Sequence, residues 1–589
     1  MRRPGPAAFL VGGLFGFVAA VNLVRAFRPL PLLDPDPSWA APRLLLGLLA
    51  IAGTAASAGA AAGAFWVWAK RDRVPSGAAE PLALSRRSLA GLSIAALFLG
   101  ALLRFASLER LPPSLWIDDL SLISPALELR GRPADFANAI RPAPYGVEKP
   151  YGSVGVLYLE GYRAALANFG TTVFGVRFLA AAAGVCSIAA VYFLARELLP
   201  SGGAALAAIV IATLRWNLVN SRWGWNGVVL APLVDVAALL LVLARRRRSA
   251  GLAAAGGAVA GVAAHVYLAA WVGAVALVLF ALWPLRGEGE GGRVRPLVRL
   301  PVAFAAAFVL CTLPIFLWKE GRVAPYFARA SDHNVVREMR RARSPMPLFG
   351  AASDSLSAPW YRADPFTGYR WLGWLLVVPV GVAAARALAH PGEEPSAFYA
   401  SHWVAALAAS VVGGQAGIPN GYRFGYLADV AAIAAASGIL LIASRRKPAA
   451  RRAIAIAAVG ALAVSGALGA HDALVEWPAR RDTFDSFHGQ DTLLGRAAAR
   501  WESFGRVAVE AGSEHSPITV EAVRKYRLDA DLVPSPSPAA KAEKARAFRV
   551  AGPRSEARAG EKVVERVRDA WGRDWGLVFA APRPPRAGA

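Results

Sequence analysis

The sequence SLAGLSIAALFLGALLRFASLERLPPSLWIDDLSL (88–122) joins an apolar run of bilayer length to an acidic pair. The run covers residues 88–106, and Asp118 and Asp119 follow it after a short segment that contains two prolines. A helix of about 20 apolar residues spans the hydrocarbon core of a membrane. Acidic side chains at a membrane rim cost free energy, so they are usually kept for ion pathways or chemistry. The stretch therefore predicts a membrane helix that delivers two carboxyl groups to one face of the bilayer.

The composition predicts a polytopic membrane protein. Of the 589 residues, 56% are hydrophobic and only 18% are charged. Apolar tracts of bilayer length recur along the whole chain, and a hydropathy reading gives about thirteen of them. The predicted spans are residues 7–24, 44–69, 88–106, 172–195, 203–219, 226–244, 251–264, 266–283, 299–318, 371–388, 398–412, 424–443 and 453–470.

Two of these predicted spans leave alternatives open. The tract 251–283 fits either a tight helical hairpin that turns near His265 or one long tilted helix. The tract 398–412 is short for a full crossing. We therefore expect an all-α membrane bundle with about 11 to 13 transmembrane helices.

The net charge of +25 follows membrane topology rather than one basic face, which argues against a nucleic-acid partner. Arginine and lysine clusters occupy alternate short loops, and the positive-inside rule makes those loops cytoplasmic. The clusters are at residues 2–3, 70–87, 245–248, 286–299 and 445–452. The other side then receives the loops 107–171 and 319–370, the turns 220–225 and 413–423, and the C-terminal tail.

Three regions are expected along the chain. Residues 1–87 would form two extra N-terminal transmembrane helices, and residues 88–470 a membrane domain with its two large outer loops. After residue 470 charge replaces apolar periodicity, so 471–589 is predicted to be a small soluble extracytoplasmic α/β domain. Its predicted elements are strands at 506–510, 548–550 and 576–579 and a helix at 516–526.

Further polar signals fall in the outer loops. The triplet Glu148-Lys149-Pro150 lies in the first large loop, Arg222 and Asn226 lie in the turn after residue 219, and Tyr422-Arg423 lie near a late turn. In this order the signals resemble the GT-C superfamily of polyprenyl-phosphate-sugar-dependent glycosyltransferases. The layout is similar to that of aminoarabinose-to-lipid-A transferases and protein O-mannosyltransferases.

The resemblance covers residues 88–443 and implies roles for several positions. Asp118 matches the catalytic aspartate, Asp119 stands where the second acid is usually Glu, and Lys149 matches the lysine that meets the donor phosphate. Tyr151 replaces the second proline of the family's E-K-P-P element, and Asn226 stands where some members carry Asp. A divalent metal ion held by two acids is therefore left open, and no other cofactor is expected.

The implied reaction needs a base and cations. An acceptor hydroxyl attacks the anomeric carbon of a sugar on polyprenyl phosphate, and a carboxylate such as Asp118 would take its proton. The departing lipid phosphate gains charge in a poorly hydrated cleft, where cations count for more than in water. Lys149, Arg222, Arg423 and the hydroxyl of Tyr422 are the phosphate-binding candidates. Each has an alternative role at the membrane interface, since such side chains also snorkel to headgroups.

The remaining candidates are weaker. Glu148, His265 and His333 are polar residues in or beside the outer side, but no histidine pair has the H-E-x-x-H spacing of a metal site. His265 lies inside a predicted span, where a packed polar side chain in the bundle explains it at least as well as a catalytic role does. The cluster of arginines at 337–343 could place several on one helix face, which would bind an anionic lipid or glycan acceptor or remain solvated.

The expected partners are thus a polyprenyl-phosphate sugar, membrane lipids, and a lipid, glycan or protein acceptor. The expected location is the bacterial inner membrane, crossed many times. Two other classes compete with the transferase. A transporter or lipid flippase would use rim acids for proton coupling, and a membrane scaffold would use the soluble tail as a receptor.

Overall fold

The computed structural model describes residues 84–116, 120, 122–128, 156–224, 226–284, 295–317, 335–352, 363–364, 368–369, 374–412, 425–444, 446–510, 517–528 and 547–580. The predicted spans 7–24 and 44–69 lie outside these residues. By their contacts, residues 79–163 and 171–589 form one compact unit, and 1–78 with 164–170 form another. The fold below is that of the first unit.

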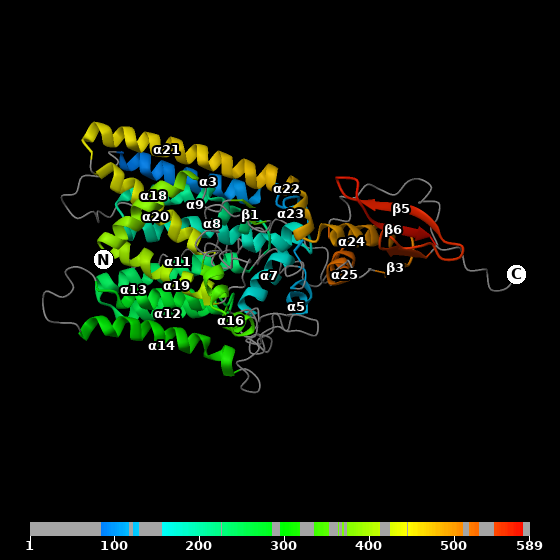
Figure 1. Cartoon of the computed structure of the whole chain (residues 1–589), viewed down its shortest axis with the longest axis horizontal. Helices are drawn as coiled ribbons and strands as arrows, with labels where there is room; N and C mark the ends of the chain where they lie inside the picture. Colours follow the sequence, from blue (N-terminus) through cyan, green and yellow to red (C-terminus); the bar gives the residue numbers. More distant parts are fainter. Residues whose placement is uncertain are drawn as a thin grey trace, which may run out of the picture. The chain divides into compact units, whose positions relative to one another are not determined.

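The membrane part of this unit is helical throughout (Figure 1). Its long helices are α3 (Arg86–Phe105), α8 (Val173–Leu198), α9 (Ser201–Thr213), α11 (Gly227–Arg247), α12 (Ala250–Ala264), α13 (Ala270–Leu282), α14 (Arg295–Leu317), α18 (Trp374–Ala389), α19 (Glu394–Val412), α20 (Leu427–Ser444) and α21 (Pro448–His471). Each overlaps one of the predicted spans, which confirms the all-α membrane bundle. The predicted span 203–219 is broken at Leu214, where α9 ends and the short helix α10 (Arg215–Asn220) begins.

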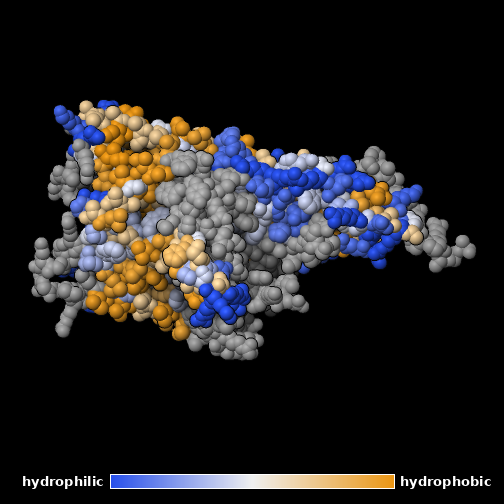
Figure 2. Space-filling view, viewed as in Figure 1, coloured by the Kyte–Doolittle hydropathy of each residue, from blue (hydrophilic) through white to orange (hydrophobic). Residues whose placement is uncertain are grey.

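By length and apolar composition alone, five described helices can cross a membrane, or six if the bent pair α18 and α19 forms one span. That pair bends by 104° at its break. Large apolar side chains cover the outside of the bundle: Phe98 is 73% exposed, Leu310 68% and Val378 64%. Figure 2 shows this apolar surface over the membrane helices and hydrophilic residues over the C-terminal elements. Such a surface matches lipid, so the protein is an integral, multi-pass membrane protein.

The tract 251–283 is a hairpin, which settles the alternative left open by the sequence. Helix α12 ends at His265, and helix α13 returns to the end where α11 finishes, because Arg245 of α11 donates to the carbonyl oxygens of Phe280 and Trp283. At the opposite end, Asn226 before α11 donates to the carbonyl oxygen of Val266. The turn of the hairpin therefore lies at the start of α11.

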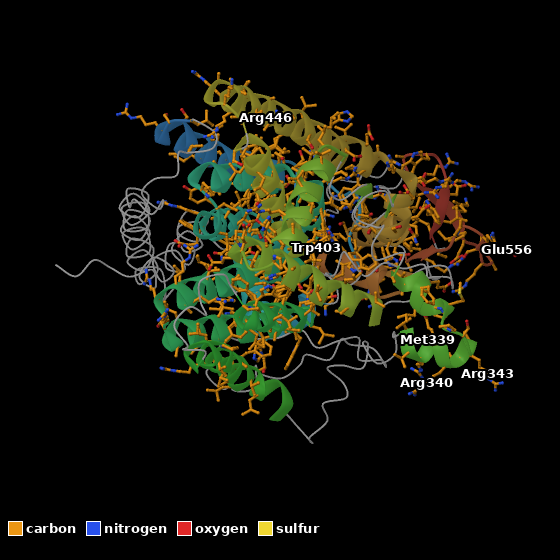
Figure 3. The ribbon with its side chains drawn as sticks, turned by 60° about the vertical axis from the view of Figure 1, so that its left-hand side comes forward. Met339, Arg340, Arg343, Trp403, Arg446 and Glu556 are labelled. Carbon is orange, nitrogen blue, oxygen red and sulfur yellow. The ribbon has the colours of Figure 1, made fainter. Side chains whose placement is uncertain are left out.

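The arginine-rich loops gather at one end of the bundle. Arg246 pairs with Glu197 at the end of α8 and with Glu394 at the start of α19. The indole of Trp283 donates to the carbonyl oxygen of Pro391 between α18 and α19. We call this the basic end. Arg446, which is labelled in Figure 3, lies in the turn between α20 and α21 and belongs to another of the arginine-rich loops.

Glycines allow three helix pairs to pack closely. A Cβ on Gly257 of α12 would lie 2.0 Å from the carbonyl oxygen of Phe304 in α14. A Cβ on Gly438 of α20 would lie 1.9 Å from the carbonyl oxygen of Pro379 in α18. A Cβ on Gly273 of α13 would lie 3.1 Å from a side-chain methyl carbon of Val234 in α11. Small residues at such positions let membrane helices approach until their backbones touch.

Replacing Gly257 by Ala is expected to lower the stability of the bundle, because the new methyl group meets backbone that cannot move aside. Overpacking of this kind costs about 1 to 3 kcal/mol. The measurement is the midpoint of thermal denaturation of the purified protein in detergent. Gly251→Ala in the same helix is the control, since its nearest neighbour is the Ser249 hydroxyl at 3.9 Å. Equal midpoints for the two variants would contradict the close packing of α12 on α14.

Shorter elements lie at the end opposite the basic end or in the segments between long helices. They are α5 (Ile123–Glu128), α7 (Val156–Phe169), α10 (Arg215–Asn220), α16 (Val335–Ala342) and the strand pair β1 (Ala363–Asp364) and β2 (Gly368–Tyr369). Helix α21 continues through a π-helical turn, Asp472–Glu476, into α22 (Trp477–Ala479) and α23 (Arg481–Ser486).

The C-terminal region is a small α/β structure, as the sequence predicted. Helices α24 (Gly489–Trp501) and α25 (Pro517–Tyr526) accompany a sheet of β3 (Val507–Glu510), β4 (Phe548–Ala551), β5 (Lys562–Arg568) and β6 (Asp574–Ala580). The strand order is β3-β4-β6-β5, and only the pair β3 and β4 is parallel. Leu494 and Trp501 of α24 pack on Phe548 and Val578 of the sheet. The predicted strands at 506–510, 548–550 and 576–579 are thereby confirmed.

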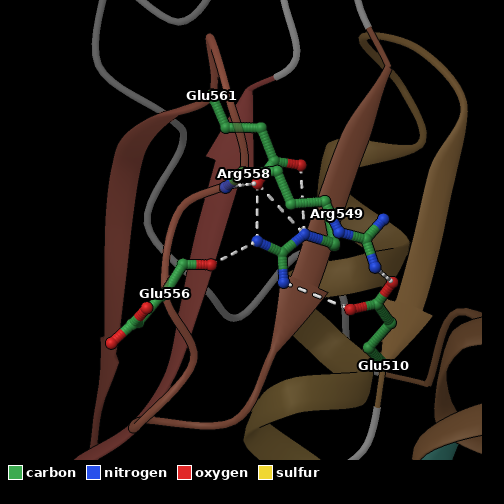
Figure 4. A network of polar contacts seen from close by, with 5 residues as sticks. All are labelled: Glu510, Arg549, Glu556, Arg558 and Glu561. Atoms are coloured by element: carbon green, nitrogen blue, oxygen red, sulfur yellow. Dashed lines mark hydrogen bonds and ion pairs between the residues drawn. The ribbon is translucent and has the colours of Figure 1, made fainter.

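An arginine joins the strands of this sheet (Figure 4). The guanidinium of Arg549 donates to the carboxylates of Glu561 and Glu510 and to the carbonyl oxygen of Glu556. Arg549 and Glu561 are each only 7% exposed at their side chains. The hydrogen bond from Arg549 lowers the pKa of Glu561 below its ordinary value. A carboxylate with a lowered pKa stabilises the fold only while it is ionised.

Acid is therefore expected to loosen this sheet. The contribution of Glu561 to the free energy of unfolding is complete above the ordinary glutamate pKa. It is lost as the pH falls through the lower pKa that Glu561 has in the folded state. Glu561→Gln should remove that part of the acid sensitivity, and Glu556→Gln should not, because Glu556 contacts Arg549 through its backbone. The measurement is hydrogen-exchange protection of β4 and β6 in the full chain, corrected for intrinsic rates. Equal pH profiles for both variants would contradict the assignment.

Candidate functional site

The candidate site begins where α3 ends, at the segment that leads to Asp118. Residues 106–116 follow the helix at the end of the bundle opposite the basic end. The amide of Leu115 lies 3.5 Å from the hydroxyl of Thr492, and Trp116 packs on Trp223 with ring centroids 5.9 Å apart. The described part of this segment ends at Trp116, two residues before Asp118.

Two buried arginines from other elements bind the backbone of this segment. Arg222, in the turn before α11, donates to the carbonyl oxygens of Leu103 at 2.6 Å and Ala106 at 2.7 Å. Arg177, in α8, donates to those of Leu108 at 2.9 Å and Ser114 at 2.5 Å. Both side chains are at most 1% exposed.

The chemistry of a helix end explains these contacts. The last carbonyl groups of a helix have no partner within the helix, and a buried carbonyl without a donor costs free energy. A guanidinium offers five N–H donors in a fixed plane, so one arginine can satisfy several carbonyl oxygens. Burial lowers the pKa of Arg222 to about 10, which leaves it protonated at neutral pH. The two arginines thus hold both the end of α3 and the path of the chain after it.

A third arginine extends this arrangement into the membrane helices. Arg104 of α3 donates to the carbonyl oxygens of Ile211 and Ala212 and, at 2.6 Å, to the side-chain oxygen of Asn217. The amide nitrogen of Asn217 donates to a carboxylate oxygen of Asp429 at 3.3 Å. These contacts join α3, α9, α10 and α20 through polar groups at the core of the bundle.

A second acid completes the buried network. The carboxyl group of Asp235 in α11 lies against that of Asp429, and both residues are at most 2% exposed. The hydroxyl of Ser221 donates to Asn217 as well. One guanidinium and two acids thus share the interior of a membrane bundle. Arg104, Asp235 and Asp429 are not among the site residues predicted from the sequence. An ionisable residue inside an apolar span is nevertheless a sequence signal for a polar or functional site.

An aromatic cluster covers the other side of the segment. Trp223 and Trp477 are buried and pack on Phe487, with centroids 5.3 Å and 5.7 Å from its ring. The ring centroid of Trp116 lies 5.9 Å from that of Phe487, in an edge-to-face arrangement, and 5.7 Å from that of His488. The cluster joins the segment after α3 to the turn after α10 and to the start of the C-terminal region.

The structure describes three of the predicted site residues. Arg222 binds backbone carbonyl groups, which gives it a structural role at the end of α3. Asn226 donates to Val266 across the hairpin turn. His265 has its Nε2 atom 2.8 Å from the carbonyl oxygen of Cys311 in α14, as expected for a packed polar side chain. Outside the described residues are Asp118, Asp119, Glu148, Lys149, His333, Tyr422 and Arg423.

A metal site is not formed by the residues that the structure describes. Among them, no group of three or more histidine, cysteine, aspartate or glutamate side chains could hold an ion. The pair Asp235 and Asp429 has Arg104 in its network, so a cation already faces these acids.

One part of this chain is similar to a known protein family. Residues 157–318 match the family model described as Dolichyl-phosphate-mannose-protein mannosyltransferase. No curated protein matches the chain. The matched residues span the elements from α7 to α14, and the description of the family agrees with the membrane glycosyltransferase predicted from the sequence.

Several solved structures are similar at low identity. ArnT from Cupriavidus metallidurans bound to undecaprenyl phosphate is 14% identical over 83% of this chain and 98% of that chain, with a TM-score of 0.49. AglB from Archaeoglobus fulgidus, in complex with an inhibitory peptide and a dolichol-phosphate, is 14% identical over 79% and 69%, with a TM-score of 0.47. The oligosaccharyltransferase of that organism with Zn and sulfate is 17% identical over 78% and 68%, with a TM-score of 0.49.

Removing the Arg177 guanidinium should destabilise the segment before Asp118. Arg177→Gln leaves two buried carbonyl groups without a charged donor, and each such hydrogen bond contributes about 1.5 to 3 kcal/mol. The measurement is the rate of proteolytic cleavage after Arg110 together with the thermal midpoint in detergent. Arg87→Gln is the control, because that arginine lies exposed at the start of α3. A segment that is cleaved at the same rate in both variants would contradict its fixation by Arg177.

Proposed function

We propose that this protein transfers a sugar from a polyprenyl-phosphate donor to a hydroxyl group of a lipid, glycan or protein acceptor. One observation carries the proposal. The residues that match the mannosyltransferase family, 157–318, include Arg177 and Arg222, the two arginines that hold the segment leading to Asp118. The matched helices thus supply the framework for the loop in which the family places its catalytic acid.

In the proposed mechanism Asp118 is the general base. The acceptor oxygen forms a bond to the anomeric carbon, the bond from that carbon to the phosphate oxygen breaks, and its electron pair leaves with the lipid phosphate. The acceptor proton passes to Asp118. A positioned base of this kind contributes about 100- to 10,000-fold to the rate. Asp119, the neighbouring acid, would orient the acceptor or Asp118 itself.

Cations would stabilise the departing phosphate. Lys149 and Arg423 are the proposed ligands, with the hydroxyl of Tyr422 as a further donor, because each lies in a predicted outer loop or turn of the bundle. A charged donor in a water-poor cleft stabilises developing charge without reorganisation. Arg222 is assigned to positioning, since its NH1 and NH2 groups are engaged by carbonyl oxygens.

The reaction would take place on the extracytoplasmic face of a bacterial inner membrane. The basic loops gather at the end where Arg246 pairs with Glu197 and Glu394, and the positive-inside rule assigns that end to the cytoplasm. The first outer loop and the C-terminal domain would then lie outside. Their contact at Leu115 and Thr492 supports a common side for the two.

The buried acids favour one alternative. Asp235 and Asp429 lie inside a membrane bundle, where ionisable groups often mark ion pathways, so a proton-coupled transporter is the second candidate. Their network with Arg104 is also what a structural role would need. Transport coupled to a proton gradient in vesicles, abolished by Asp429→Asn, would favour the transporter and oppose the transferase.

Replacing Asp118 by Asn is expected to stop turnover while donor binding remains. The loss should be about 100-fold or more, because the amide cannot accept the proton. The measurement is consumption of a panel of polyprenyl-phosphate sugars by the purified protein, with donor binding measured separately. Glu109→Gln is the control, since Glu109 is an exposed acid in the same loop. Full activity of the Asp118→Asn variant would overturn the assigned base.

Replacing Lys149 by Gln should act on the donor instead. Loss of one charged contact to the lipid phosphate is expected to raise the KM for the donor and to lower kcat, since the contact strengthens as charge develops. Lys149→Arg should restore part of both. An unchanged kcat/KM in the Lys149→Gln variant would show that this lysine serves the interface only.

A further inference from the structure

An exposed basic helix lies in the second outer segment. Helix α16 (Val335–Ala342) is followed by Arg343, whose backbone has the left-handed φ of 47°. Arg340, Arg341 and Arg343 are exposed, whereas Val335 on the other face is buried. Figure 3 shows the side chains of Arg340 and Arg343 pointing away from the ribbon.

The spacing puts the charges on one face of the helix. Residues three and four positions apart are neighbours on a helix, so Arg337, Arg340 and Arg341 share a face. Val335 and Met339 lie on the opposite face, and α16 contacts helix α19 of the membrane bundle. The arginine face therefore points away from the protein while the apolar face packs against it.

Apolar side chains are exposed directly beside these arginines. The chain turns at Ser344, whose hydroxyl accepts from the amide of Met346, and a second helical stretch covers residues 346–352. Met346 is 68% exposed and Phe349, one turn later, is 62% exposed. Figure 2 shows the hydrophilic atoms of this region next to a hydrophobic patch. We call Arg340, Arg341, Arg343, Met346 and Phe349 the basic-apolar surface.

The position of this surface makes its charge unusual. Helix α14 starts at the basic end, near the loop after α13, and its Cys311 lies at the hairpin turn of the opposite end, beside His265. The segment after α14 therefore emerges on the side where the positive-inside rule expects few arginines. A cluster of cations there needs a reason other than topology. Phosphate groups are the anions that a membrane surface offers.

We propose that the basic-apolar surface binds the phosphate headgroups of anionic phospholipids in the bilayer that holds the protein. Arg340, Arg341 and Arg343 would bind the headgroups, and Met346 and Phe349 would enter the acyl-chain boundary. This combination of a cationic face with exposed apolar side chains is what an interfacial helix requires. It would hold the second outer segment on the membrane surface, beside the mouth of the bundle.

The test measures which lipids surround this surface in the full chain. Cys186 and Cys311 are replaced by Ala, and Ala342, which is exposed between two of the arginines, is replaced by Cys and labelled with a fluorophore. The protein is placed in nanodiscs that contain either brominated phosphatidylglycerol or brominated phosphatidylcholine at equal mole fraction. The proposal expects stronger quenching by the anionic lipid than by phosphatidylcholine. Quenching by the anionic lipid should weaken in 0.5 M salt, because salt shortens the electrostatic screening length to about 4 Å.

Matched double variants separate this surface from general charge. Arg340→Gln with Arg343→Gln should reduce the enrichment of anionic lipid by on the order of 5-fold per arginine. Arg506→Gln with Arg554→Gln, two exposed arginines of the C-terminal domain, should leave it unchanged. Equal quenching by both lipids would overturn the proposal. A second outcome would also overturn the proposal: the Arg340 and Arg343 double variant shows unchanged quenching but a higher KM for the lipid-phosphate donor. That result would assign the surface to binding of the donor substrate.

Discussion

The contact between buried guanidinium groups and backbone carbonyl oxygens is the interaction on which the site depends. Moving an arginine out of water costs several kcal/mol unless its donors are satisfied. Arg177 and Arg222 meet that requirement with carbonyl oxygens of one short segment, so the side chains and the segment stabilise each other. Neither arginine nor segment could be buried in this way without the other.

This mutual requirement orders the surrounding bundle. Arg222 lies in the turn between α10 and α11, and Arg177 lies in the first turns of α8, so three helices must be in place before the segment can be fixed. Arg104 adds a link to α9 and α20 through Asn217 and Asp429. The glycine contacts of α12 with α14 and of α18 with α20 bring the remaining helices close enough to enclose this polar core.

The sequence predicted the bundle well because apolar length is a strong signal. The predicted spans from residue 88 onward and the strands at 506–510 and 576–579 follow from local pattern and correspond to elements of the structure. Of the two alternatives that the sequence left open for 251–283, the structure shows the hairpin that turns near His265. From the sequence, Arg222 is a candidate for binding phosphate or lipid headgroups, because an arginine beside a turn looks the same whether it binds an anion or a carbonyl oxygen. Its partners at Leu103 and Ala106 are more than 100 positions away, as the spacing of 119 and 116 shows. No local pattern encodes such a pairing.

The aromatic cluster has a consequence for the C-terminal domain. Phe487 packs on Trp116, Asp485 two residues earlier pairs with Arg573 in the turn between β5 and β6, and Arg573 also stacks on Trp575. A displacement of the sheet would therefore be transmitted through Arg573, Asp485 and Phe487 to Trp116, two residues before Asp118. The polar and aromatic contacts of the C-terminal region thus constrain the same short segment that the buried arginines hold from the bundle.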